Sequence, residues 1–196
     1  MIRLLILAAF IATVVLIGAV RPPICAGLYV GTVIYAIFLP AGLLAKWRLT
    51  KTFPLAFLVY FASLIAAGAV AAAVPPIRAE YQTLQERQTK FFAEAANCPV
   101  GEPTVAIQAL ALAPLVEEVM FRGLLFEEAR QRLGTAAAYL ISSLLFALLH
   151  SPGLGAVPIF IIALSLAYAY HKHGLPASVA IHFFQNAIAL FLAKVS

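Results

Sequence analysis

The sequence contains no aspartate, and only 11% of its 196 residues are charged. A soluble domain carries about 25% charged residues, whereas 64% of this chain is hydrophobic. No segment interleaves basic and aromatic residues as nucleic-acid-binding proteins do, and a net charge of +5 is ordinary for the cytoplasmic flanks of membrane spans. The composition therefore predicts a protein of the lipid bilayer with no nucleic-acid partner.

Neither internal repeats nor a soluble domain are visible in the sequence. Cysteine is also scarce. Cys25 and Cys98 form no metal-binding pattern. We interpret them as two unrelated apolar residues, because a disulfide would need both to face an oxidising compartment. The topology predicted below does place both on the outer side of the membrane.

Seven apolar segments approach the roughly 20 residues that a membrane span needs. They cover residues 3–20, 24–45, 54–75, 104–126, 135–150, 156–171 and 175–194. The first is interpreted as a retained span, because its apolar core exceeds the roughly 7–15 residues of a signal peptide. The predicted fold class is all-α: a polytopic transmembrane bundle of about seven spans.

The segment 77–101 is the one long polar stretch. Its apolar residues recur at roughly helical spacing and are Ile77, Tyr81, Leu84, Phe91 and Phe92. This pattern predicts an amphipathic helix along the membrane interface. We interpret it as a connecting helix, with a gate over a cavity as the alternative.

Basic residues in short loops predict the orientation, because they concentrate on the cytoplasmic side. One side collects Arg3, Lys46, Arg48, Lys51, Arg130, Arg132 and Lys172, and the other Arg21, Arg78, Arg87, Lys90 and Lys194. The first side is richer. We therefore expect a multi-pass protein of a bacterial-type plasma membrane, with its N-terminus in the cytoplasm and its C-terminus outside.

Two adjacent carboxylates and an arginine lie inside the fourth apolar segment. Ionisable residues at such depth are candidates for function. Glu118 and Arg122 are four residues apart, share a helix face and can form an ion pair. Glu117 points about 100° away from Glu118 and is free to face a cavity. The alternative is that both acids only neutralise Arg122, and it is stronger for Glu118 than for Glu117.

Further polar residues lie in two other apolar segments. His150 ends the fifth, where it could simply complement the helix dipole. His182 and Asn186 are four residues apart in the last segment and share a face, with Gln185 about 100° round the helix. A helical bundle can bring Glu117, His150, His182 and Asn186 into one internal cavity.

These residue types suit amide hydrolysis. A glutamate in a buried cavity can take a proton from water, and a histidine can orient that water. An asparagine amide and an imidazole N–H can stabilise the oxyanion of the tetrahedral intermediate. Two histidines and a glutamate are also a zinc ligand set, here Glu117, His150 and His182, although HExxH is absent. The sequence leaves the activation of water by zinc or by a carboxylate open, and no cofactor is certain.

Three motifs occur in order, each within an apolar segment. Residues 117–122 read EExxxR and are followed by Gly123, residues 146–150 read FxxxH, and residues 182–186 read HxxxN. Together they resemble the CPBP family of intramembrane proteases, which includes the type II CAAX prenyl endopeptidases, or Abi proteins. The resemblance covers about 104–190. We therefore divide the chain into N-terminal spans with the interfacial segment, 1–102, and a catalytic helical core, 103–192.

The resemblance implies a site in a cavity reached from the cytoplasmic side. It implies that Glu117 is the general base for water with His150 beside it, and that His182 and Asn186 stabilise the oxyanion. The remaining motif residues, Glu118 and Arg122, would have supporting roles. The family has been called both metalloprotease and glutamate-dependent protease, which leaves the metal open.

The predicted function is an intramembrane endopeptidase acting on a membrane-anchored protein or peptide. Smaller, bacterial-type members are expected to clip anchored tails, sorting signals or peptide precursors, or to serve bacteriocin immunity. A proton- or ion-coupled transporter is the first alternative, although the internal repeats typical of transporters are not visible. A non-catalytic immunity or scaffold protein is the second alternative.

Overall fold

The computed structural model describes residues 2–195, and every regular element in this range is a helix. This confirms the all-α prediction. The elements are α1 (Ile2–Val20), α2 (Ile24–Phe38), the short 3₁₀ helix η1 (Leu39–Leu44), α3 (Leu55–Ala73), α4 (Pro75–Ala96), α5 (Gly101–Ile107), η2 (Gln108–Leu112), α6 (Ala113–Glu118), η3 (Val119–Phe126), α7 (Glu127–Leu133), α8 (Thr135–His150), α9 (Ala156–His173) and α10 (Leu175–Val195).

Five helices are long and apolar enough to cross a membrane: Ile2–Val20, Ile24–Leu44, Leu55–Ala73, Gly101–Leu133 and Leu175–Ala193. The other two segments predicted as spans are also helices. However, α8 has only 16 residues, and α9, with 18, is not among the five. The protein is therefore an integral membrane protein with five candidate spans. Helix α4 connects the third span to the fourth, and α8 and α9 connect the fourth to the fifth.

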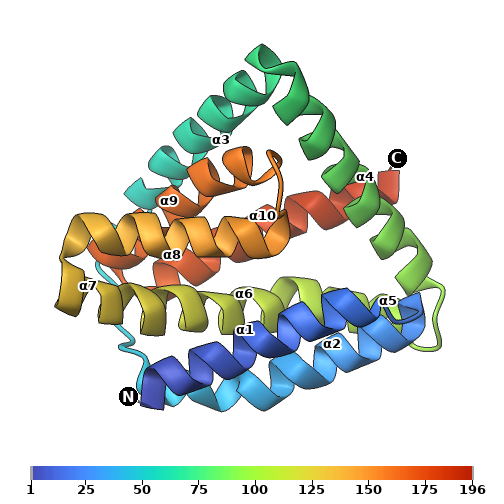
Figure 1. The fold of residues 1–196 in the computed structure, drawn as a ribbon, viewed down its shortest axis with the longest axis horizontal. Helices are drawn as coiled ribbons and strands as arrows, with labels where there is room; N and C mark the ends of the chain where they lie inside the picture. The colour runs from blue at the N-terminus through green and yellow to red at the C-terminus, as the bar shows by residue number, and fades with distance from the viewer. Residues whose placement is uncertain (1, 196) are drawn as a thin grey trace.

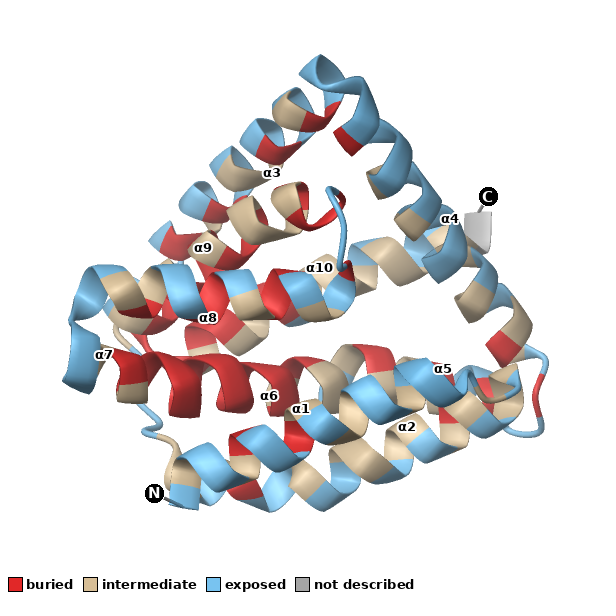
Figure 2. Ribbon diagram, viewed as in Figure 1, coloured by how far each residue is buried: buried red, intermediate tan, exposed pale blue. Residues whose placement is uncertain are grey.

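The helices enclose a core around the long helix Gly101–Leu133. In Figure 1, α3 and α4 meet at an apex and form two sides of a triangle, α1 and α2 lie along the third side, and α8 and α10 lie inside. Figure 2 shows buried residues concentrated on the long helix from α6 to α7 and on α9. The outer helices expose large apolar side chains such as Leu5, Leu16 and Ile65. This distribution suits helices surrounded by lipid hydrocarbon. Their apolar side chains face the lipid, and their backbone polar groups are hydrogen-bonded within each helix.

The long helix changes its hydrogen-bond register twice. Its stretches η2 and η3 are π-helical. In η2 the N–H of Ala113 bonds the carbonyl of Gln108, five residues back. The next N–H in this register would belong to residue 114, but Pro114 has none. The carbonyl of Ala109 therefore lacks its partner within the helix. Such π stretches inside α-helices frequently mark functional sites.

Helix α4 follows α3 after Val74 and begins with the two prolines Pro75 and Pro76, which favour the first turn of a helix. The apolar face predicted from the sequence is buried or half-buried along its whole length, whereas most of the polar residues between are exposed. The amphipathic helix is thus confirmed in the structure.

The turn between α9 and α10 fixes where α10 begins. Gly174 has φ +99°, a conformation that L side chains rarely adopt, and a Cβ there would collide with the backbone carbonyl of Arg48. The same chain segment is held by a hydrogen bond from the N–H of Thr50 to the carbonyl of His173, 3.1 Å long. This close approach sets the start of the helix that carries His182.

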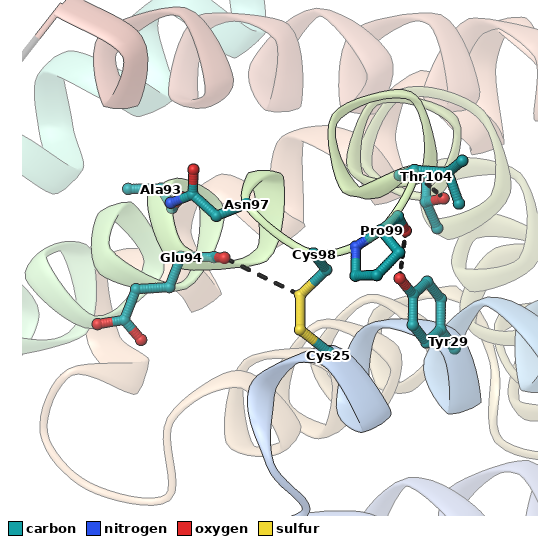
Figure 3. Close-up of a disulfide and its surroundings, with 9 residues drawn as sticks. Cys25, Tyr29, Ala93, Glu94, Asn97, Cys98, Pro99 and Thr104 are labelled. Carbon is teal, nitrogen blue, oxygen red and sulfur yellow. Dashed lines mark hydrogen bonds between the residues drawn. A yellow bond between two sulfur atoms is a disulfide. The ribbon is translucent and has the colours of Figure 1, made fainter.

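Cys25 and Cys98 form a disulfide, so the interpretation of two unrelated apolar residues is wrong. The bond joins the first turn of α2 to the turn between α4 and α5, with the two Cα atoms 5.6 Å apart (Figure 3). Beside it, the hydroxyl of Tyr29 donates to the carbonyl of Pro99. The sequence separation of 73 hid this pairing, because only the packing of α2 against α5 brings the two cysteines together.

Candidate active site

Three polar side chains from three helices converge at the midpoint of the long helix. Glu117 Oε2 on α6 lies 3.6 Å from Nε2 of His150 on α8 and 3.9 Å from Nε2 of His182 on α10. Glu117 and His182 are buried, at 8% and 4% exposure, whereas the His150 side chain is 39% exposed. The structure therefore places a carboxylate oxygen between two imidazoles, one of them accessible.

Glu118 and Arg122 lie behind this group and are fully buried. The Arg122 Nη1 lies 3.3 Å from Glu118 Oε1. Arg122 also donates through Nη2 to the carbonyl of Ala163 on α9, and its guanidinium lies 4.5 Å from the centre of the Phe146 ring on α8. One arginine thus joins the long helix to two neighbouring helices, α8 and α9, which is the arrangement of a structural residue.

The hydrogen bonds fix which imidazole nitrogens carry protons. His150 Nδ1 donates to the carbonyl of Phe146 at 2.8 Å, because a carbonyl can only accept. His182 Nδ1 lies 3.0 Å from Glu118 Oε1, and the ion pair with Arg122 makes that oxygen an acceptor. In their neutral forms both imidazoles therefore present a bare Nε2 toward Glu117.

Tyr35 on α2 is a site residue that sequence reasoning missed. Its hydroxyl donates to Glu117 Oε1 at 2.5 Å. This bond orients the carboxylate so that Oε2 faces the two histidines. Glu117 Oε2 is buried and has no hydrogen-bond partner in the part of the chain that the structure describes. Nothing near Tyr35 in the sequence signals this role, because the contact bridges 82 residues.

Asn186 reaches the long helix rather than the other polar groups. Its Nδ2 donates to the carbonyl of Ala109 at 2.8 Å, the same carbonyl that Pro114 leaves without a helical partner. The second N–H of the amide and its oxygen remain for other contacts. Asn186 therefore ties α10 to the π-helical stretch η2 at the wall of the site.

A cavity of about 720 Å³ opens beside these residues, and Glu117, His150, His182 and Asn186 line it. This volume lies in the range of small-molecule and peptide pockets. One wall is α4, which contributes Gln85 and Gln88 among others. Burial raises the pKa of Tyr81 on this wall, so its hydroxyl stays a hydrogen-bond donor at neutral pH. The segment expected as a connecting helix thus lines the site.

The metal set considered from the sequence, Glu117, His150 and His182, stays a prediction. Within residues 2–195, no group of three or more His, Cys, Asp or Glu side chains could hold a metal ion. The closest approach to such a set is the trio Glu117, His150 and His182, whose nearest atoms are separated by 3.6 and 3.9 Å.

The comparison with protein families bears on the same helices. Residues 99–188 match the family model described as "Type II CAAX prenyl endopeptidase Rce1-like". The match covers slightly less than half of the chain and spans all three motifs. It confirms the resemblance drawn from them. No curated protein and no solved structure matches this chain.

This match supports a CAAX-type membrane protease with a membrane-associated substrate. The segment it covers begins in the turn that holds Cys98 and ends within α10. Helices α1 to α4 lie outside it. The division of the chain at residues 102 and 103 stays a prediction.

Proposed function

We propose that the protein is a glutamate-type intramembrane endopeptidase that hydrolyses a peptide bond of a membrane-associated protein or peptide. The observation that carries the proposal is the buried, unpartnered Oε2 of Glu117 between two imidazole Nε2 atoms. Glu117 Oε2 and the bare Nε2 of His150 are two acceptors beside one point, and they suit a water molecule, which can donate one hydrogen bond to each. Its oxygen is then available as a nucleophile on the cavity side.

In the first step the water oxygen attacks the carbonyl carbon of the scissile bond, and Glu117 takes the water proton. His150 orients the water through Nε2, while its own Nδ1–H stays on Phe146. The C=O bond opens to an oxyanion. Glu117 then returns the proton to the amide nitrogen, the C–N bond breaks, and an amine and a carboxylic acid leave. A positioned general base of this kind contributes about 10²- to 10⁴-fold in rate.

His182 and Asn186 supply the donors for the oxyanion. The carboxylate of Glu118 accepts the Nδ1–H of His182 and holds the ring with Nε2 toward the cavity, and for this role Nε2 must also carry a proton. Asn186 contributes the amide N–H that Ala109 does not use. Such preorganised donors stabilise developing charge strongly in a water-poor site.

A metal ion, if one binds, would be held by Glu117, His150 and His182 after their side chains move. It would supply a Lewis acid for the same water. The steps above need only the residues of this chain.

The test is a comparison of wild type with Glu117→Gln in membranes of the native host, read by mass spectrometry of membrane-anchored peptides. We expect peptides that lose a terminal piece only with the wild type, and a rate at least about 10²-fold lower in the variant. Glu128→Gln is the matched control, because Glu128 pairs with Arg132 far from the cavity.

Identical peptide profiles from wild type and Glu117→Gln, with both proteins folded and abundant, would contradict proteolysis. A pH-dependent flux in liposomes that Glu117→Gln abolishes would instead indicate a proton-coupled transporter. Full biological activity of the variant would indicate an immunity or scaffold protein. The transporter is disfavoured by the closed packing behind Glu118 and Arg122, which are both fully buried.

A further inference from the structure

The two ends of the molecule differ in charge. The N-terminal end of α1 and the loops after η1 and α7 lie at one end, at the left of Figure 1, and the C-terminus and α5 lie at the other. Contacts tie the first end together: Arg3 donates to the carbonyl of Leu44, and Arg48 donates to the carbonyl of His171. This basic end carries the seven residues Arg3, Lys46, Arg48, Lys51, Arg130, Arg132 and Lys172 against two acids, Glu127 and Glu128.

The opposite end carries the disulfide. The sequence segments that the predicted topology assigns to this side contain five basic residues, Arg21, Arg78, Arg87, Lys90 and Lys194, nearly balanced by four acids, Glu80, Glu86, Glu94 and Glu102. The Cys25–Cys98 bond lies among the ends of α2, α4 and α5. Disulfides persist in oxidising compartments, whereas basic loops stay in the cytoplasm. Two independent signals thus assign the same orientation, with the disulfide end outside.

The cavity extends only toward the disulfide end. On the long helix its lining residues run from Val105 to Glu117, and none comes from the part between Glu118 and Leu133. On α10, which runs antiparallel to the long helix, the lining residues run from His182 to Leu192 and none precedes His182. All of these positions lie on the disulfide side of the Glu117–His182 pair.

The other side of the pair is closed by packing. Arg122, Phe126 and Leu175 are each 0% exposed, and Phe121 is 1% exposed. These residues lie between the site and the basic end, and they belong to the continuous core of the bundle, apart from Arg122 itself. A substrate cannot reach Glu117 from the basic end without unpacking this core.

Resting on the proposed function, we propose that the site takes its substrate from the oxidising, non-cytoplasmic face of the membrane. The substrate class is a peptide segment that extends from a membrane anchor into the non-cytoplasmic compartment. The amide side chains of Gln85 and Gln88 on α4 can hydrogen-bond an extended backbone, and apolar positions of α10 such as Ile188 line the path beside them. This access differs from the cytoplasmic access that the family resemblance implies.

Thiol labelling of two matched variants tests this access. Gln88→Cys puts a thiol on the α4 wall of the cavity, and Gln131→Cys puts one between Arg130 and Arg132 at the basic end; both glutamines are exposed. Intact cells are treated with a membrane-impermeant maleimide and then compared with permeabilised cells. The parent chain is the blank, because its cysteines are held in the disulfide.

We expect Gln88→Cys to be labelled in intact cells and Gln131→Cys to be protected until permeabilisation. The reverse pattern, or labelling of both in intact cells, overturns the proposal. The readout needs no cleavage. If the Glu117→Gln comparison fails, the proposed protease activity is rejected and the proposed orientation is unaffected. If the labelling experiment fails, only the proposed side of substrate access is rejected. Where both succeed, the cleavage points found by mass spectrometry should lie on the side that the maleimide reaches.

Discussion

At the scale of single residues, the site depends on Tyr35 as much as on the motif residues. Its hydroxyl fixes one oxygen of Glu117 and leaves the other facing the histidines. We expect Tyr35→Phe to lower kcat roughly 10- to 100-fold with little change in KM, because a hydrogen bond to a charged group is worth about 1.5–3 kcal/mol. The measurement is the cleavage rate of a product peptide identified with the wild type.

Tyr29→Phe is the control for this prediction. Tyr29 lies on the same helix but donates to Pro99 beside the disulfide. Equal rates for the two variants would mean that Tyr35 does not position the carboxylate. A rise in KM alone would mean that it contacts substrate instead.

Arg122 is a fully buried charge on which the packing of three helices depends. Replacing it with leucine leaves Glu118 charged and buried beside His182 alone. Breaking a buried pair in this way costs about 3–5 kcal/mol. We therefore expect Arg122→Leu to lower the thermal midpoint in detergent sharply. Arg132→Leu, which breaks an exposed pair with Glu128, should cost no more than about 1 kcal/mol. Similar midpoints for the two variants would contradict the structural role of Arg122.

At the scale of elements, Pro114 and Asn186 form one unit. The proline leaves the carbonyl of Ala109 without a helical partner, and the amide of Asn186 supplies one. We expect Asn186→Ala to cost about 1–3 kcal/mol, the price of an unsatisfied buried carbonyl. In a Pro114→Ala background the cost should shrink, because residue 114 then offers its own N–H. A double-mutant cycle of thermal unfolding measures this coupling. If the two substitutions change the free energy of unfolding additively, Pro114 and Asn186 do not act as a unit.

The local features of these elements could be predicted from the sequence, and the long-range ones could not. The four-residue spacing of Glu118 and Arg122 predicts their ion pair, and the structure contains it. The apolar spacing along α4 likewise predicts an amphipathic helix. By contrast, the π-helical stretch η2 is associated with a proline, a carbonyl without a helical partner and a side chain 77 residues away. Tyr35 and the disulfide depend on how α2 packs, which no local pattern encodes.

At the scale of the whole molecule, the disulfide links α2 to the turn between α4 and α5, at the end toward which the cavity extends. It closes a loop of 73 residues that includes η1, α3 and α4. Removing a cross-link of this kind typically costs about 2–4 kcal/mol. We expect Cys25→Ser with Cys98→Ser, or reduction of the wild type, to lower the thermal midpoint in detergent. A reductant should then have no further effect on the double variant. A wild type insensitive to reductant would show that the bond does not form.

The buried cluster also has a consequence for how the chain enters the membrane during synthesis. The long helix leaves the ribosome carrying Glu117, Glu118 and Arg122, and each such charge costs about 2.5–3.5 kcal/mol at the centre of a helix during insertion. Glu118 and Arg122 pair with each other within the helix, and Tyr35, the partner of Glu117, has already been made. Their further partners follow 41 residues later at Ala163 and 64 residues later at His182. We therefore expect full stabilisation of the helix in lipid only after α10 has been made.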